Sequence, residues 1–309
     1  MTSGRPNRPT SNVPGGERRG LLDTFLAPRP PVDSPMPNLR SSLARGVVTA
    51  LSTPALVVVV PLVLVAEWLG LVATGFQGPF AILVNAFAMP PIGTLTDVSI
   101  TGGLFPSGLG SLIGIAVAIA LRTLLLAFVT AAAVQTIRTG AATRWVVAPA
   151  IRALPVALAV NVLSVLLLFT QSVLGSLFGG AIGALGLIVL FGGMVLGVSY
   201  LGFATPIAAA EQRRLADALG RSFRAARMPG SGNLTLAVLY VVPSFAVLVA
   251  PGKPGGLIGV NPSIGAWVLA IGVNLLHVAI TATYVFRYLS VAEVVPDASE
   301  RRRPAARAR

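Results

Sequence analysis

The sequence predicts an all-α polytopic membrane protein, a bundle of about six transmembrane helices with both chain ends in the cytoplasm. The chain of 309 residues is 54% hydrophobic and only 11% charged, whereas a soluble domain is about one quarter charged. Several apolar runs exceed the roughly 20 helical residues that cross a hydrocarbon core. The basic residues, finally, occupy alternate connections between these runs.

The six expected spans form a transmembrane domain over residues 46–290. They cover residues 46–73, 111–136, 153–178, 181–209, 234–250 and 263–287. The fifth is the shortest, and Pro243 is expected to interrupt it because proline lacks an N–H. Residues 1–45 are rich in Pro, Gly, Ser and Arg and lack the apolar core of a signal peptide. We expect them to be a disordered basic cytoplasmic tail, and residues 291–309 to be a second one.

The distribution of basic residues predicts the orientation of the chain. All but two of the 23 basic residues lie in the N-terminal tail, in the second and fourth connections, or at the end of the chain. The two exceptions are Arg122, inside the second span, and Lys253, in an alternate loop. Basic residues collect in cytoplasmic loops, so a multi-pass protein of the cytoplasmic (inner) membrane with both termini inside is predicted.

The fourth connection, residues 210–230, predicts an amphipathic helix on the inner membrane surface. At 100° per residue, Leu215, Leu219, Ser222, Phe223 and Ala226 cluster on one side. The opposite side carries Asp217 and the arginines expected to contact anionic lipid or a partner protein: Arg213, Arg214, Arg221, Arg224 and Arg227. No aromatic residues are interleaved for base stacking, so nucleic acid is not expected as a partner.

Two further segments carry packing or surface predictions. The first outer loop holds an apolar piece at residues 78–90 that is too short to cross the membrane, and it is expected to be re-entrant or interfacial. The fourth span carries a stripe of glycines with a period near 3.5, which favours close packing of helices within the chain or in a homo-oligomer. The stripe consists of Gly179, Gly183, Gly186, Gly193 and Gly197.

The polar residues inside the spans form the candidate intramembrane site. It consists of Arg122, Glu67, Asn161, Asn274 and His277. An arginine in the hydrocarbon core needs a partner or water, and Glu67 on the first span is the expected partner. A structural ion pair and a substrate or ion site both remain open. The amides are expected to hydrogen-bond between helices, or to line a polar pathway together with His277.

The stretch ALGRSFRAAR at residues 218–227, between the fourth and fifth spans, resembles the membrane-domain family found beside glycerophosphoryl diester phosphodiesterases. The resemblance covers residues 40–290 and implies a multi-span membrane domain that also occurs alone in bacterial membrane proteins. The phosphodiesterase activity of some relatives belongs to a separate soluble domain with several histidines. This sequence has one histidine, so the resemblance brings no catalytic residue.

These observations leave two functions open. The first is a non-enzymatic role in organising the membrane or assembling a partner protein, and the alternative is a small-solute or lipid transporter that uses the intramembrane polar residues. The chain has no cysteine and one histidine, which excludes thiolate sites and any site with two imidazoles in one chain. Neither a cofactor nor a metal is expected, and no nucleophile or nucleotide-binding motif indicates an enzyme.

Overall fold

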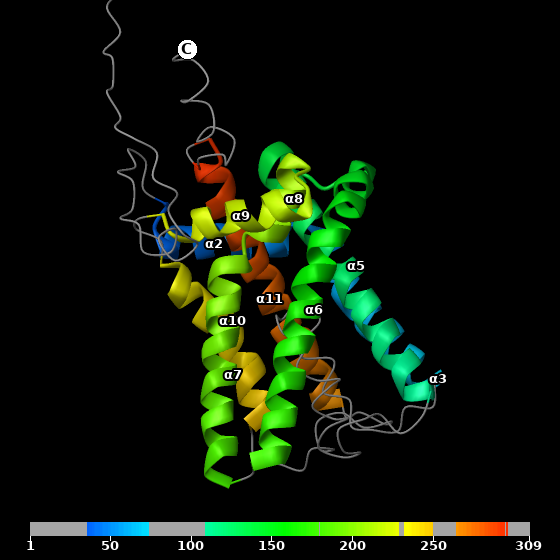
Figure 1. The fold of residues 1–309 in the computed structure, drawn as a ribbon. Helices are drawn as coiled ribbons and strands as arrows, with labels where there is room; N and C mark the ends of the chain where they lie inside the picture. The colour runs from blue at the N-terminus through cyan, green and yellow to red at the C-terminus, as the bar shows by residue number, and fades with distance from the viewer. Residues whose placement is uncertain are drawn as a thin grey trace, which may run out of the picture. The chain divides into compact units, whose positions relative to one another are not determined.

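The computed structural model describes residues 36–73, 109–178, 180–228, 232–249, 264–293 and 295, which are helical apart from short connections and contain no strand. The elements are α2 (Leu39–Ser52), α3 (Pro54–Ala73), α5 (Leu109–Thr139), the short 3-10 helix η2 (Arg144–Val146), α6 (Val147–Phe178), α7 (Gly180–Leu201), α8 (Ala204–Glu211), α9 (Leu215–Ala226), α10 (Asn233–Val249) and α11 (Ile264–Val291) (Figure 1). The all-α class is confirmed for these residues.

Three stretches of the described residues are long and apolar enough to cross a membrane: Ile119–Thr139, Arg144–Leu163 and Phe191–Glu211. A fourth exists if Leu39–Ser52 and Pro54–Ala66 are one bent span. The membrane class is therefore supported with three to four candidate spans. Six spans and the direction of threading remain predictions of the sequence.

The first predicted span is wrong at its start, because the chain bends by 74° between α2 and α3. Proline disfavours a helical conformation in the residue before it, and Thr53, before Pro54, is extended with φ −107° and ψ 99°. The Thr53 hydroxyl donates to the Thr49 carbonyl at 2.8 Å, which satisfies an acceptor at the end of α2. The helix α2 begins at Leu39, so residues 39–45 are not part of a disordered tail.

The fourth predicted span is divided between α7 and α8. Pro206 has no N–H, and its ring clashes with the carbonyl four residues earlier, that of Gly202. Gly202 also lacks room for a side chain, because a Cβ there would lie 2.5 Å from the Val198 carbonyl oxygen and 2.8 Å from the Tyr284 ring. By contrast, α10 continues through Pro243, so the predicted interruption of the fifth span is wrong.

Neighbouring helices donate hydrogen bonds to two carbonyls near the end of α7, one of which, that of Val198, also accepts from the Gly202 N–H at 2.9 Å. The Tyr284 hydroxyl of α11 donates to the Val198 carbonyl at 3.3 Å, and the Ser222 hydroxyl of α9 donates to the Tyr200 carbonyl at 2.6 Å. Backbone groups left unpaired in a membrane interior cost several kcal/mol. The break is therefore stabilised from two directions by side chains far away in the sequence.

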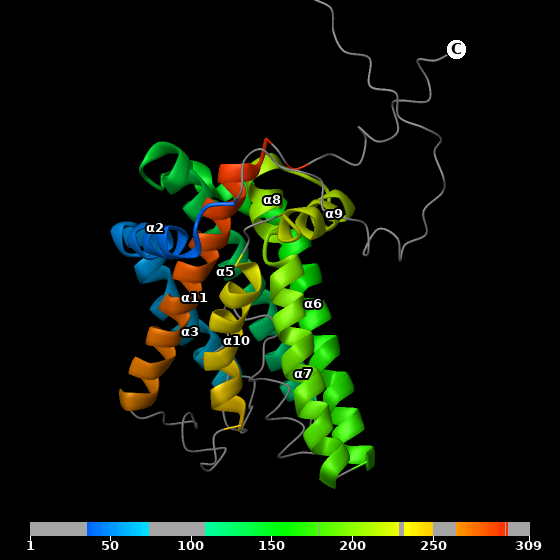
Figure 2. The same ribbon diagram turned by 90° about the vertical axis from the view of Figure 1, so that its left-hand side faces the viewer.

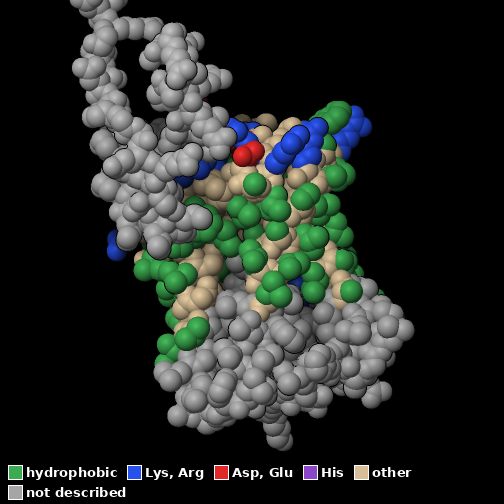
Figure 3. All heavy atoms as spheres, in the orientation of Figure 1, with side chains coloured by type: hydrophobic (Ala, Val, Ile, Leu, Met, Phe, Trp, Pro, Cys, Tyr) green, Lys and Arg blue, Asp and Glu red, His purple; other side chains and the backbone are tan. Residues whose placement is uncertain are grey.

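The helix α11 packs against α2, α3, α5, α8 and α10, and the pairs α3–α5, α5–α6, α6–α7 and α7–α10 also pack together. Both views show α2 and α9 lying across the long helices at one end, where α8 also lies (Figures 1 and 2). We call this the α8–α9 end. In the face shown in Figure 3, arginine side chains gather there, and hydrophobic side chains cover the flank of the long helices.

The helix α2 crosses α11 at Gly46. A Cβ at Gly46 would lie 2.0 Å from the Thr283 Oγ1 and 2.5 Å from the Ala279 carbonyl oxygen. In the described half of α7, the buried residues are Met194, Val195 and Val198, with Ser199. Of the predicted glycine stripe, Gly193 and Gly197 are half-buried beside them.

Other predictions about packing and the termini lie beyond what the structure describes. Gly179 is outside the described residues, and no contact of Gly183 or Gly186 is described, so packing by the stripe stays a prediction. The segment 78–90, residues 1–35 of the first tail and residues 296–309 of the second tail also lie outside the described residues.

Candidate functional site

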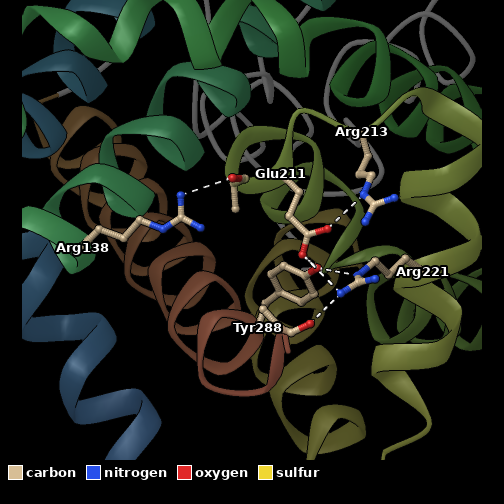
Figure 4. A network of polar contacts seen from close by, with 7 residues as sticks. Arg138, Glu211, Arg213, Arg221 and Tyr288 are labelled. Carbon is tan, nitrogen blue, oxygen red and sulfur yellow. Dashed lines mark hydrogen bonds and ion pairs between the residues drawn. The ribbon is translucent and has the colours of Figure 1, made fainter. Parts of the chain in front are cut away.

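The α8–α9 end is built around Glu211, the last residue of α8 (Figure 4). Its carboxylate accepts from the Arg213 Nε at 3.1 Å and pairs with the Arg221 Nη2 at 3.4 Å. The Tyr288 hydroxyl of α11 donates to the same carboxylate. One carboxylate thus links α8, α9 and α11.

Arg221 is buried within this network, with a relative exposure of 6%. Its Nε donates to the Tyr288 hydroxyl at 2.8 Å, and its Nη2 donates to the Ala292 carbonyl at 2.5 Å. A buried guanidinium is tolerated only where hydrogen bonds and a counter-charge replace water. The prediction that Arg221 faces lipid is therefore wrong, since it fixes α9 to α11.

The buried face of α9 lies beside the apolar face that the sequence indicated. Its buried residues, Ala218, Arg221, Ser222 and Ala225, recur at the spacing of one helix face. The predicted apolar residues other than Ser222 are half-buried or exposed, and Phe223 stacks on Tyr200 of α7 with ring centroids 5.4 Å apart. The helix α9 therefore has three faces: one packs against the bundle, one is apolar and one is basic.

A second buried arginine, Arg287, joins α11 to the start of α2. It is fully enclosed, and its Nη1 donates to the Pro37 carbonyl at 2.9 Å and lies 3.4 Å from the Ser42 hydroxyl. Its Nε donates to the Asn233 Oδ1 at 3.2 Å, which ties in the start of α10. The sequence marks Arg287 only as the end of a span, because its partners lie up to 251 positions away.

The turn between α8 and α9 gathers two more arginines. The Arg138 Nη1, from the end of α5, donates to the Ala210 carbonyl at 3.2 Å. The Arg152 Nη1, from the first turns of α6, donates to the Gln212 side-chain carbonyl. Gln212 has a left-handed backbone with φ 57°, which turns the chain sharply after α8. Neither Arg138 nor Arg152 was among the predicted site residues, since only the fold brings them to this turn.

The remaining predicted arginines are accessible at the α8–α9 end. Arg214 is exposed, and Arg213, Arg224 and Arg227 are half-buried. Arg213 pairs with Glu211, and none of the four is as enclosed as Arg221. Contact of these four arginines with lipid or a partner protein stays a prediction.

The structure describes the side chains of four of the five predicted intramembrane site residues. Arg122 is 1% exposed in α5, and beside it the Thr123 hydroxyl accepts from the Asn161 Nδ2 of α6 at 3.0 Å. This bond is an interhelical amide contact of the kind predicted for Asn161. The Glu67 side chain lies outside the described part of α3, so its pairing with Arg122 stays a prediction.

Asn274 and His277 are both fully buried on α11. The His277 Nε2 lies 3.0 Å from the Tyr240 carbonyl oxygen of α10, and the two rings stack with centroids 4.4 Å apart. Tyr240 is three residues before Pro243, in the turn whose backbone bonding a proline weakens. His277 therefore joins α10 to α11 at that turn.

A cavity of about 40 Å³ lies between these helices. It is lined at the α7–α8 break by Gly202 and Thr205, and elsewhere by Asn161, Tyr240 and Thr281 among other residues. One water needs about 10–15 Å³ measured in this way and two to four polar partners, so the cavity has room for a few waters. It brings Asn161 near the Tyr240 ring that His277 stacks on.

Within the described residues, no group of three or more His, Cys, Asp or Glu side chains could hold a metal ion. No family model, no curated protein and no solved structure matches the chain. The resemblance to the phosphodiesterase-associated membrane domain therefore stays a prediction.

Proposed function

We propose that this chain is a six-span protein of the cytoplasmic membrane, with both termini inside, that organises the inner membrane face or assembles a partner protein there without catalysis. Three to four candidate spans are present in the described residues. The arginine-rich end carries α8 and α9, and basic residues favour the cytoplasmic side. The resemblance to a membrane domain that accompanies other proteins points the same way.

The observation that carries this proposal is the fixation of α2 and α9 across one end of the bundle. A helix that only floats among headgroups buries its apolar face in lipid and keeps its charges outside. In contrast, α9 buries Arg221 in the protein, and α2 is held at its start by Arg287. The two helices are thus fixed parts of the bundle, and a basic surface with fixed geometry suits recognition of a partner.

The orientation can be tested by labelling single cysteines, because the native chain contains none. Ser41→Cys on α2 and Arg224→Cys on α9 should react with a membrane-impermeant maleimide only from the cytoplasmic side of the membrane. Lys253→Cys, in a predicted outer loop, is the control and should react only from outside. Labelling of Ser41→Cys or Arg224→Cys from outside would contradict the proposed threading.

The partner can be sought by photo-crosslinking in the native membrane. A benzophenone side chain at Arg214 or Arg224 should capture the same protein, because both positions belong to one fixed surface. The matched control is Ile188, an exposed apolar residue of α7, which should capture only lipid. Lipid adducts alone at all three positions would refute partner assembly and leave membrane organisation.

The cavity at the α7–α8 break favours a second candidate, a small-solute or lipid transporter. Broken helices often border binding sites in transporters, and this break borders a cavity containing Asn161 and Tyr240. If the core opens to water, Thr205→Cys and Thr281→Cys should react with a charged methanethiosulfonate reagent in intact membranes. A dry core, with no reaction at either position, would exclude this alternative.

A further inference from the structure

We infer that the turn between α8 and α9, together with the exposed guanidinium groups of Arg138 and Arg152, binds the phosphate of an anionic phospholipid of the inner leaflet. We call this the turn site. It rests on the orientation proposed above and adds a defined ligand to it. The inference depends on how the fold places two arginines, not on the number of arginines in the sequence.

The first support is the convergence of cations from two helices on one short segment. Arg138 ends α5 and Arg152 belongs to the start of α6, and they donate to Ala210 and Gln212, two residues apart. Each bond uses one N–H of a guanidinium that has five. Both side chains are exposed, so each keeps donors for a ligand oxygen outside the protein.

The second support is the local charge. Glu211 is the carboxylate within this turn, and its oxygens already contact Arg213 and Arg221. Arg138 instead faces the Ala210 backbone carbonyl, and Arg152 faces the neutral side-chain amide of Gln212. Both groups lie at the carboxyl end of α8, where the helix dipole supplies a partial negative charge that favours cations. No carboxylate is paired with either arginine by these two bonds. With Arg214 exposed two residues after Gln212, the turn carries an excess of positive charge that a phosphate would neutralise.

The third support fixes the source of the phosphate as a lipid. Trp145, between Arg138 and Arg152 along the chain, is 69% exposed, and Val147 and Ile151 are more than half exposed. The Arg144 guanidinium lies 5.2 Å from the Trp145 ring centroid. Tryptophan beside arginine is typical of the headgroup region of a membrane. An apolar patch next to the cations suits the acyl chains of a phospholipid, which a free phosphate does not have.

The turn site can be tested by native mass spectrometry of the whole protein, titrated with phosphatidylglycerol or with phosphatidylcholine. The native protein should bind phosphatidylglycerol more tightly. The double variant Arg138→Gln, Arg152→Gln should bind it about 25-fold more weakly, since each arginine near an anionic surface contributes about fivefold. The matched control is Arg40→Gln, Arg45→Gln on α2, which removes two exposed arginines and should leave binding unchanged.

Three outcomes would overturn the turn site. They are retention of phosphatidylglycerol by the Arg138, Arg152 variant, an equal loss in the α2 control, and displacement of the lipid by inorganic phosphate at low concentration. The last would identify a free-phosphate site. Crosslinking at Arg224 tests the proposed function separately, so a missing partner with selective lipid binding would refute only partner assembly.

A second measurement leaves every arginine in place, in case the double variant does not fold. In a chain carrying Trp68→Phe and Trp267→Phe, Trp145 is the remaining tryptophan. In mixed vesicles, phosphatidylglycerol with brominated acyl chains should quench Trp145 fluorescence more strongly than the same amount of brominated phosphatidylcholine. Equal quenching by the two lipids would overturn the inference.

Discussion

Gly46→Ala is the substitution whose effect follows most directly from the geometry. The added Cβ would meet the Ala279 carbonyl oxygen at 2.5 Å and the Thr283 backbone nitrogen at 2.9 Å. Both are backbone atoms of α11 and cannot rotate away. Because Cβ contacts under 3.0 Å essentially never occur, α2 must move away from α11.

The expected cost is set by two opposing terms. Overpacking of this kind costs about 1–3 kcal/mol, while alanine in place of a helical glycine contributes about 0.5–1 kcal/mol of stability. The matched control is Gly192→Ala in α7, where nothing lies within 4 Å of the added Cβ. Gly192→Ala should therefore gain only the helix stability of alanine and pay no packing cost. The two variants should then differ in unfolding free energy by the whole packing cost, about 1–3 kcal/mol.

The assay is equilibrium unfolding of the detergent-solubilised protein with increasing SDS, followed by helical circular dichroism. Gly192→Ala should unfold at a higher SDS fraction than the native chain, and Gly46→Ala at a lower fraction than Gly192→Ala. If the two variants are equally stable, α2 does not cross α11 at Gly46, and the described packing of α2 is refuted.

Three further changes test the polar contacts. Arg221→Leu should lower the unfolding free energy by about 3 kcal/mol, because it removes a buried ion-pair partner of Glu211. The control Arg45→Leu, at an exposed position, should change the unfolding free energy by less than about 0.5 kcal/mol. Equal effects of the two variants in SDS titrations would contradict the Glu211 network. Asn161→Ala and Thr123→Val should each cost about 0.6 kcal/mol, and the double variant no more than one of them, while additive losses would argue against their bond. Glu67→Ala should reduce the yield of folded protein as Arg122→Ala does, with partial recovery in the double variant; additive damage would exclude their pairing.

The positions of the helices could largely be read from the sequence, but the breaks between them could not. Pro61, Pro155 and Pro243 lie inside α3, α6 and α10, whereas the chain bends at Pro54 and breaks before Pro206. All five are prolines in apolar surroundings. Whether a helix continues through a proline depends on which neighbouring groups bond to the carbonyls left without a backbone partner. At the break before Pro206, one such neighbour is the Ser222 hydroxyl, which bonds to the Tyr200 carbonyl although the two residues are more than twenty positions apart.

For the candidate site, too, some features could be read from the sequence and others could not. The arginines of residues 213–227 were identified from composition and spacing, and four of the five are exposed or half-buried in the structure. The helical wheel could not show that Arg221 is enclosed, because its partner Tyr288 lies 67 positions away. Arg287 was missed for the same reason. The one local signal for Arg287 is its position as a charged residue at the end of an apolar run.

The sequence by itself determined that this protein is helical and apolar enough for a membrane, because partitioning into hydrocarbon is a sum of local terms along the chain. It also predicted an orientation from charge. Only the tertiary structure decided which arginines are enclosed, where α7 ends and how Arg138 and Arg152 meet the turn after α8. Those outcomes depend on hydrogen bonds between distant residues, whose directions are fixed only once the helices have packed.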